Sequence, residues 1–299
     1  MTMKRLIFLA IVAIGMVALH SCSQEDEQEY PVAKKVKPAS NMRELTEQLK
    51  AYDARFIRIE EMPARLPGGV TFSKLDYAKL AITDVCGGIR GAGGGVIGII
   101  GGAVGSSLWK GCKMYASKYL KIQLKNQIRK SPIATYDGNV SYQDSIGYFH
   151  NTIEYALYQQ NSNSHLLPMS TLVSATNERM MEMSPNYRAS GGMSPEEISS
   201  LSAGLEAVKN VDTSLSYKNY FAELKNEYPE SADVIDFCAE YVYTLLYANV
   251  DAEDYTREVL YMIKKSNVDL SDGEAAYRGI QIGYASVLFS QSVTYTKVN

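Results

Sequence analysis

The sequence has few of the side chains that bind metals or attack substrates. It contains three histidines, one of them at the end of an N-terminal apolar run, and four cysteines that form no metal-binding cluster. The HExxH and GxSxG patterns are missing, as are the P-loop and any GxGxxG followed by an acidic residue. These absences argue against a zinc peptidase, a serine hydrolase and a nucleotide-binding protein.

Two short patterns match catalytic or metal-binding motifs only in part. Ser107 and Lys110 fit the SxxK pattern of serine-lysine hydrolases, but the companion motifs of that class are missing. His150 and Glu154 are four residues apart and share a helix face, yet no third metal ligand is visible. We therefore expect no enzymatic activity, no cofactor and no metal site.

Basic charge is scarce as well. The formal net charge is −3, and no basic stretch is long enough to indicate a nucleic-acid partner. The mildly basic segment 113–130 fits either the solvent face of a surface helix or contact with anionic lipid headgroups.

The N-terminus carries the strongest signal in the chain. Lys4 and Arg5 precede an uninterrupted apolar run at 6–19, which is short of a bilayer span of about 20 residues but typical of a signal-peptide core. The run ends in LHSC (residues 19–22), which resembles the lipobox of bacterial lipoproteins. The resemblance implies that a signal peptide at 1–21 is removed and that Cys22 carries the lipid anchor.

The residues after the lipobox resemble sorting signals. Ser23 is similar to outer-membrane rather than inner-membrane sorting residues, and the acidic SQEDEQE (23–29) resembles the surface-export signal of Bacteroidetes lipoproteins. The resemblance implies a lipid-anchored outer-membrane protein that is exposed at the cell surface; the alternative is that the acidic residues only solvate the chain. With two prolines and no periodicity at 30–40, the segment 22–40 is predicted to be a tether.

Beyond the tether, helical periodicity dominates and no long strand pattern is visible. We expect an N-terminal helical region at 41–130 and a C-terminal helical region at 131–299, packed together as one all-α, multi-helix globular domain. Among its helices, 114–129 is predicted from an amphipathic pattern. Capping boxes that begin at Ser194 and Ser271 predict two helix starts, and Asp251 predicts a third.

Tyrosine is by far the commonest aromatic residue, with 22 copies. Tyrosines that recur at helical spacing near the C-terminus could stack on sugars, but such residues also pack between helices with their hydroxyls at the surface. The tyrosines concerned are Tyr241, Tyr243, Tyr247, Tyr255, Tyr261, Tyr277 and Tyr284.

The least ordinary segment is a glycine-rich run. Residues 91–109 carry no charge, and eight of them are glycine. Glycines four apart lie on one helix face, where they let another helix approach closely. The segment 87–105 resembles the glycine zippers of membrane-active peptides, bacteriocins among them, and of some envelope proteins. Its rows are Gly87, Gly91 and Gly95; Gly94, Gly98 and Gly102; and Gly101 and Gly105.

Some contact must order this segment, because each interior glycine costs a helix about 1 kcal/mol relative to alanine. Three arrangements are open: a buried helix hairpin with its turn at 93–95, a membrane-inserting or self-associating helix with Trp109 as an interfacial anchor, or a flexible loop. A disulfide between Cys86 and Cys112 is compatible with the hairpin and excluded by a straight helix; buried free thiols are the alternative.

Three functions are consistent with these features. The first is a non-enzymatic cell-envelope lipoprotein that contacts a membrane, a protein partner or itself through 87–105. The second is a bacteriocin-like toxin that inserts this segment into a membrane. The third is a surface lipoprotein that binds glycans through its tyrosines.

Overall fold

The computed structural model describes residues 38–56, 73–91, 95–117, 120–124, 146–160, 166–212 and 214–297. Lys37–Asn299 forms one compact unit. The predicted signal peptide, Cys22 and almost all of the predicted tether lie outside the described residues.

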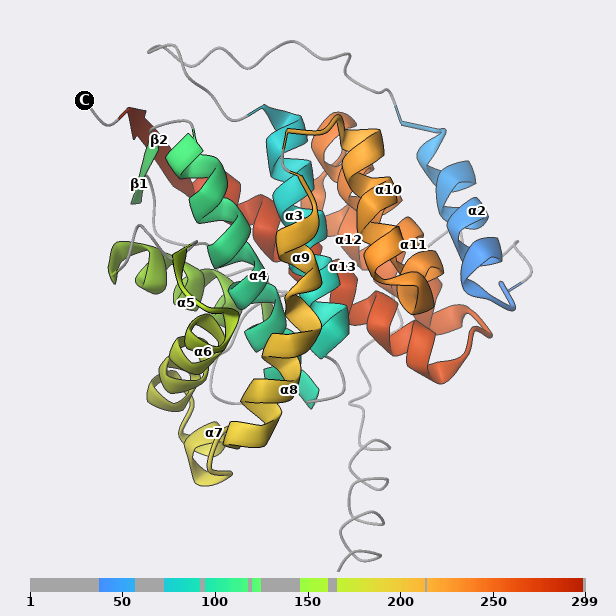
Figure 1. Cartoon of the computed structure of the whole chain (residues 1–299). Coiled ribbons are helices and arrows are strands. Elements are labelled where there is room, and N and C mark those ends of the chain that lie inside the picture. Colours follow the sequence, from blue (N-terminus) through green and yellow to red (C-terminus); the bar gives the residue numbers. More distant parts are fainter. Residues whose placement is uncertain are drawn as a thin grey trace, which may run out of the picture. The chain divides into compact units, whose positions relative to one another are not determined.

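The fold is all-α, as the sequence predicted, and the described part adds only one short pair of strands (Figure 1). In chain order the elements are α2 (Met42–Asp53), α3 (Lys74–Gly91), α4 (Gly95–Ser117), β1 (Leu120–Leu124), α5 (Ile146–Gln160), α6 (Met169–Met183), α7 (Pro185–Ala189), α8 (Pro195–Leu205), α9 (Ala207–Asn210), α10 (Tyr217–Glu227), the 3-10 helix η4 (Pro229–Ser231), α11 (Ala232–Tyr247), α12 (Ala252–Lys265), α13 (Leu270–Ser292) and β2 (Val293–Lys297).

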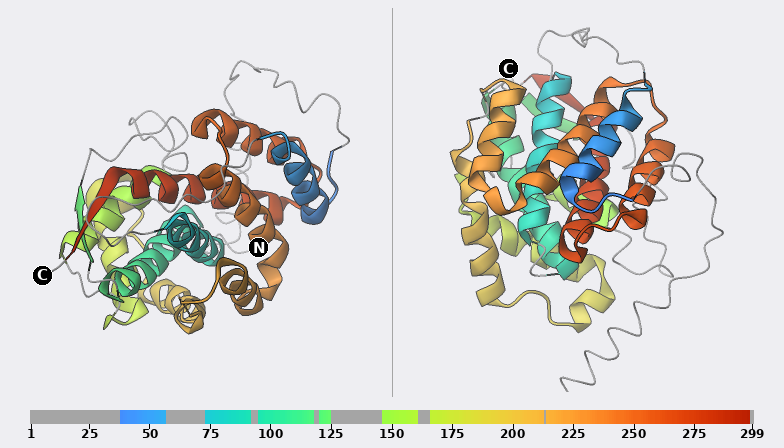
Figure 2. Two further views of the ribbon diagram at one scale, coloured as in Figure 1. Left: turned by 90° about the horizontal axis from the view of Figure 1, so that it is seen from above. Right: turned by 90° about the vertical axis from the view of Figure 1, so that its right-hand side faces the viewer.

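The glycine-rich segment forms a central helix hairpin. Helix α3 packs along α4, and most of the other helices pack around the pair, whereas α2 packs on α11 and α12 on α13. On the α3 side lie α10, α11 and α13, whereas α5, α6 and α8 contact α4. Figure 2 shows α13 on one side of the hairpin and α8 and α10 on the other. The hairpin is therefore the core of the fold, as in the first of the three arrangements that the sequence left open. Of its predicted turn at 93–95, the first two residues lie outside the described part and Gly95 belongs to α4.

Two glycine rows face each other across this hairpin. A Cβ atom on Gly91 would lie 1.8 Å from the carbonyl oxygen of Gly98, and one on Gly87 would lie 2.3 Å from that of Gly102. Such distances leave room for a hydrogen only, so the two backbones touch. The third row does not join this contact.

That third row faces the opposite side of α4. A Cβ on Gly101 would meet Leu201 of α8 at 3.4 Å, and one on Gly105 would meet Met169 and Val173 of α6 at 3.5 Å. These are ordinary van der Waals separations. Gly95 opens α4, and Gly94 lies outside the described residues.

The predicted helix at 114–129 is wrong. Helix α4 ends at Ser117, and β1 follows and pairs antiparallel with β2, with Leu120 opposite Lys297. The sequence LKIQL of β1 alternates apolar and polar residues, which favours a strand once β2 supplies its partner. A pattern that reads as helical in isolation is thus overridden by pairing with the far end of the chain.

Two of the three predicted helix starts have the N-cap that the sequence indicated. Ser194 forms the expected capping box: its hydroxyl accepts from the Glu197 amide, and the Glu197 carboxylate accepts from the Ser194 amide. Asp251 caps α12 as predicted. The box at Ser271 is wrong, because α13 begins one residue earlier and Asp269 accepts from the Ser271 amide and hydroxyl.

Cys86, Cys238 and Trp109 lie in the core. Cys86 is a buried free thiol, so the disulfide with Cys112 is not formed. The reason is the register of the hairpin: the pairing of Gly87 with Gly102 puts Cys86 beside residue 103, about 14 Å along α4 from Cys112, beyond the roughly 7 Å that a disulfide spans. Trp109, which the membrane-inserting alternative would place at the interface, is buried.

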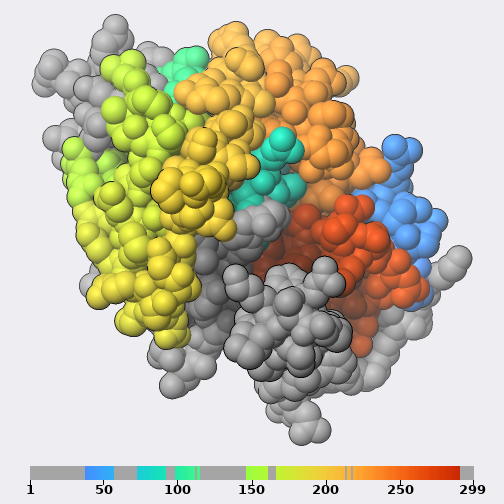
Figure 3. Space-filling model, turned by 60° about the horizontal axis from the view of Figure 1, so that its bottom comes forward, coloured from blue at the N-terminus to red at the C-terminus, as the bar shows by residue number. Residues whose placement is uncertain are grey.

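Most of the C-terminal tyrosines are also core residues. Tyr241 and Tyr255 stack at 5.4 Å between ring centroids, and both are buried, as are Tyr247 and Tyr284. Figure 3, a view from below, shows part of the hairpin as a small patch between α8 and α10. These four tyrosines therefore serve helix packing, whereas Tyr243 lines a surface groove.

Candidate functional site

A cluster of polar side chains lies where α3, α4, α5 and α13 meet. Asp84 comes from α3, and His150 and Glu154 come from α5, one helical turn apart. All three side chains are at most 4 % exposed. One ligand atom can be taken from each so that the three atoms lie within 4.8 Å of one another. These three residue types in one closed site form a candidate metal centre.

Two serines support the carboxylates from the neighbouring helices. The Ser107 hydroxyl of α4 donates to Glu154 Oε1 at 2.5 Å, and the Ser286 hydroxyl of α13 donates to Asp84 Oδ2 at 2.5 Å. The imidazole lies between the acids, with Nε2 3.7 Å from Asp84 Oδ2 and Nδ1 3.6 Å from Glu154 Oε2. The side chains of the cluster thus make polar contacts that connect four helices, α3, α4, α5 and α13.

Burial controls the charges of the cluster. It raises the pKa of Glu154 to about 7, because the carboxylate is removed from water. The pKa of Asp84 lies well above its ordinary value, first because of burial and then because of the nearby Glu154 carboxylate. Burial lowers the pKa of His150 to about 4, so its imidazole is neutral at pH 7. Without a cation, the cluster therefore favours its neutral forms.

The sequence found two of the three members. The His150–Glu154 pair was visible from its spacing, whereas Asp84 was missed because it is distant in the chain. One signal was available: Asp84 is an acid inside the apolar stretch 80–86 of a predicted helix, where a buried charge needs a partner.

The SxxK pattern does not assemble a catalytic pair. Ser107 donates to Glu154, whereas the Lys110 ammonium donates to the backbone carbonyls of Val208 and Val211 on another side of α4. Both side chains are buried. A hydrolase needs its serine and its base within hydrogen-bond reach of one another, which this arrangement does not provide.

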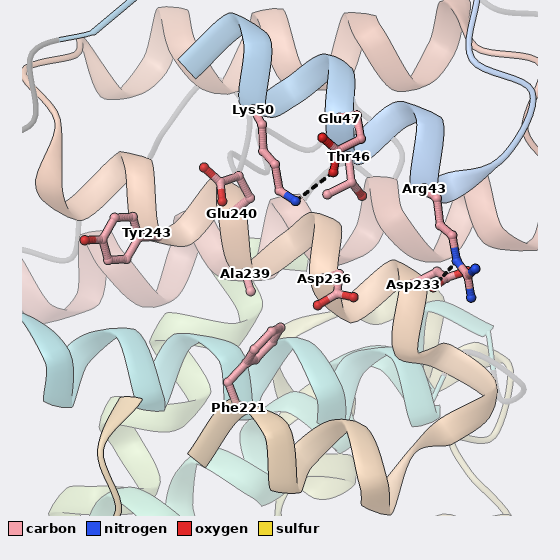
Figure 4. A pocket seen from close by; sticks show the side chains of 10 residues that line it. All are labelled: Arg43, Thr46, Glu47, Lys50, Phe221, Asp233, Asp236, Ala239, Glu240 and Tyr243. Atoms are coloured by element: carbon pink, nitrogen blue, oxygen red, sulfur yellow. Dashed lines mark hydrogen bonds and ion pairs between the residues drawn. The ribbon is translucent and has the colours of Figure 1, made fainter. Parts of the chain in front are cut away.

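A groove of about 570 Å³ lies between α2, α10 and α11. Figure 4 shows the Arg43–Asp233 pair at one end of the groove and Tyr243 at the other. The Phe221 side chain points from α10 toward α11. The groove therefore combines aromatic rings with charged groups. Its size falls in the usual range for pockets that hold small ligands.

Most charges in the groove are paired within the chain. Arg43 contacts Asp233 at 3.1 Å, and Lys50 contacts Glu47 at 2.8 Å. Asp236 is bound by Lys225 at 2.8 Å. Glu240 lines the same wall of α11. These pairs hold polar groups in fixed positions while they reduce the net charge that the groove offers to an ionic ligand.

No family model matches the chain, and neither a curated protein nor a solved structure shows significant similarity to it. Among the described helices, none has the combined length and hydropathy that a membrane crossing requires.

Proposed function

We propose that the protein is a non-enzymatic cell-envelope lipoprotein whose helical domain binds a neutral, hydroxyl-rich ligand such as a glycan in the groove between α2, α10 and α11. The observation that carries this proposal is the composition of the groove. Aromatic rings can stack on the apolar faces of a sugar, and ion pairs held in place can hydrogen-bond its hydroxyls.

The glycine-rich segment is less suited to be the binding surface. Its facing rows contact each other, and its third row contacts α6 and α8. A partner that used these glycines would first have to displace helices of the same domain. The groove, in contrast, is open to solvent: the Arg43 side chain is 82 % exposed and that of Glu47 is 71 % exposed.

Membrane attachment through an acylated Cys22 completes the proposal. It is supported by the lipobox-like LHSC and by the acidic residues that follow it. Cys22→Ser is expected to abolish incorporation of a labelled fatty acid and to release the protein from the outer-membrane fraction. Protease treatment of whole cells then tests whether the domain faces the medium.

Ligand binding is tested on a glycan array with the full chain in detergent. We expect a defined subset of glycans to bind and Tyr243→Ala to weaken that binding about tenfold, which corresponds to about 1.4 kcal/mol of stacking. Tyr261→Ala, a half-buried tyrosine of α12 that does not line the groove, is the matched control. Absence of any glycan binding by the folded protein would refute the ligand class.

A further inference from the structure

The protonation pattern of His150 can be assigned from its neighbours. The Asn151 amide nitrogen donates to the Ala285 carbonyl at 2.9 Å, which fixes the orientation of the amide group. Asn151 Oδ1 then lies 2.9 Å from His150 Nδ1 and can only accept. Nδ1 therefore carries the proton, and Nε2 presents a lone pair. Histidines that bind metals are commonly oriented in this way, with the second ring nitrogen donating to an oxygen.

The lone pair of His150 meets another acceptor. Nε2 has no hydrogen-bond partner, and it lies 3.7 Å from Asp84 Oδ2. Asp84 Oδ1 is also without a partner, although the Asp84 side chain is 2 % exposed. The separation exceeds that of a hydrogen bond, but it is close to the roughly 3.4 Å expected between two ligands bound to one tetrahedral ion at about 2.1 Å each. Nε2 and Oδ1 are thus two buried acceptors without a donor, which a bound cation would satisfy.

The charges of the site lead to the same conclusion. Asp84 and Glu154 are two acids inside the core, and in the described part of the chain no lysine or arginine pairs with either. Their serine donors satisfy one oxygen of each acid but supply no positive charge. A divalent cation would balance both carboxylates while the imidazole stays neutral.

We propose that Asp84, His150 and Glu154 bind one divalent transition-metal ion, with zinc as the best match to the mixed nitrogen and oxygen ligands. The ion ties α3 to α5, and Ser107 and Ser286 orient its carboxylates from α4 and α13. Because the three side chains are buried, the ion is expected to stabilise the core. The site is independent of the groove, so either proposal can fail alone.

The first experiment measures the metal directly. The full chain is purified in detergent, stripped with a chelator, and incubated with Zn²⁺, Mn²⁺ or Mg²⁺ before dialysis and elemental analysis. We expect one Zn²⁺ per chain and a higher melting temperature with Zn²⁺ than with Mg²⁺. Substitution with Co²⁺ should give the visible absorption of a low-symmetry site with a nitrogen ligand. A chain that retains no metal and whose melting temperature does not respond would overturn the proposal, leaving a protonated, hydrogen-bonded cluster.

Variants then assign the ligands. Asp84→Asn and Glu154→Gln keep the shape of the side chains and should abolish stoichiometric zinc binding. Asp53→Asn is the matched control, because Asp53 is an equally buried acid that accepts from Thr244 and Tyr255 elsewhere in the core. Zinc binding that survives both ligand variants, or that is lost equally in Asp53→Asn, would contradict the assignment.

A last variant separates the coordination from mere packing. Asn151→Ala removes the group that orients His150 but leaves every ligand in place, and it should weaken zinc binding about 10–100-fold without abolishing it. Should a ligand variant fail to fold, this measurement and the Co²⁺ spectrum of the unaltered chain still decide the question. Unchanged zinc affinity in Asn151→Ala would count against coordination through Nε2.

Discussion

Gly91 of α3 and Gly98 of α4 lie so close together that a Cβ on either would fall within 2.0 Å of the carbonyl oxygen of the other. Gly87 and Gly102 repeat this relationship one turn further along the hairpin, again within 2.3 Å. Neither pair can accept a methyl group unless the helices separate. The α3–α4 contact is therefore made by backbone atoms, and its geometry fixes how the surrounding helices can pack.

The two classes of glycine should respond in opposite ways to alanine. Gly91→Ala forces the hairpin apart and is expected to lower the free energy of unfolding by about 3 kcal/mol, the upper end of the usual cost of overpacking. Gly105→Ala meets its neighbours at 3.5 Å and should be neutral or stabilising by up to about 1 kcal/mol, because alanine favours the helix. Urea denaturation followed by circular dichroism measures both. Equal destabilisation by the two variants would contradict the packing described above.

The hairpin shows which helix contacts can be predicted from the spacing of glycines along the sequence. Glycines four apart predicted close helix contact, and this is confirmed for Gly87, Gly91, Gly98 and Gly102. Spacing could not tell that Gly101 and Gly105 face other helices, since that depends on where α6 and α8 pack. The same spacing at Gly279 and Gly283 of α13 was overlooked, although a Cβ on Gly279 would lie 2.6 Å from the Cys238 sulfur.

The polar cluster shows which contacts cannot be predicted from spacing within one helix. His150 and Glu154 share one helix, so their proximity follows from helix geometry. Asp84 reaches them because α3 and α5 both pack against α4 and α13. The strand at 120–124 was missed for a similar reason, since its partner is at the opposite end of the chain. What could not be predicted is in each case a contact between distant segments.

Asp53 holds the end of α2 against the core. Its buried carboxylate accepts from Thr244 Oγ1 at 2.8 Å and from the Tyr255 hydroxyl at 3.0 Å. Tyr255→Phe removes one donor to a buried acid and should cost about 1.5–3 kcal/mol of unfolding free energy. Because α2 forms one wall of the groove, ligand affinity should fall as well. Tyr261→Phe, a half-buried tyrosine on the same helix, serves as the control and should change stability by less than about 0.5 kcal/mol.

Lys110 should give the protein an unusual response to alkaline pH. Burial, with a smaller contribution from Lys113, lowers its pKa from 10.5 to about 7, although Asp212 and Glu223 act in the opposite direction. Between pH 7 and about 10 the unfolded chain therefore binds this proton and the folded chain releases it. The Lys110 contribution to the free energy of unfolding thus rises with pH over this range.

Lys110→Met tests whether the Lys110 contribution to the free energy of unfolding rises with pH. Unfolding free energies of the variant and the unaltered chain are measured at pH 7 and pH 9.5, and the difference between the two proteins should shift in favour of the unaltered chain at the higher pH. Lys113→Met removes only the smaller of the two contributions that lower the Lys110 pKa, so it should weaken the pH dependence without abolishing it. A difference that does not vary with pH would mean that Lys110 keeps its proton in the folded state.

Membrane leakage distinguishes the structural role of the hairpin from that of a bacteriocin-like toxin. Residues 23–299 are added to dye-loaded liposomes, so that the lipid anchor does not contribute. We expect no dye release, because Gly87, Gly91, Gly98, Gly101, Gly102 and Gly105 all face neighbours within their own domain and the Lys110 side chain is buried beside α9. Gly91→Ala supplies the comparison, since it forces the hairpin apart and should increase leakage if the segment has any affinity for lipid. Release by the unaltered domain at the same protein-to-lipid ratio would favour the toxin and would mean that the hairpin leaves the core readily.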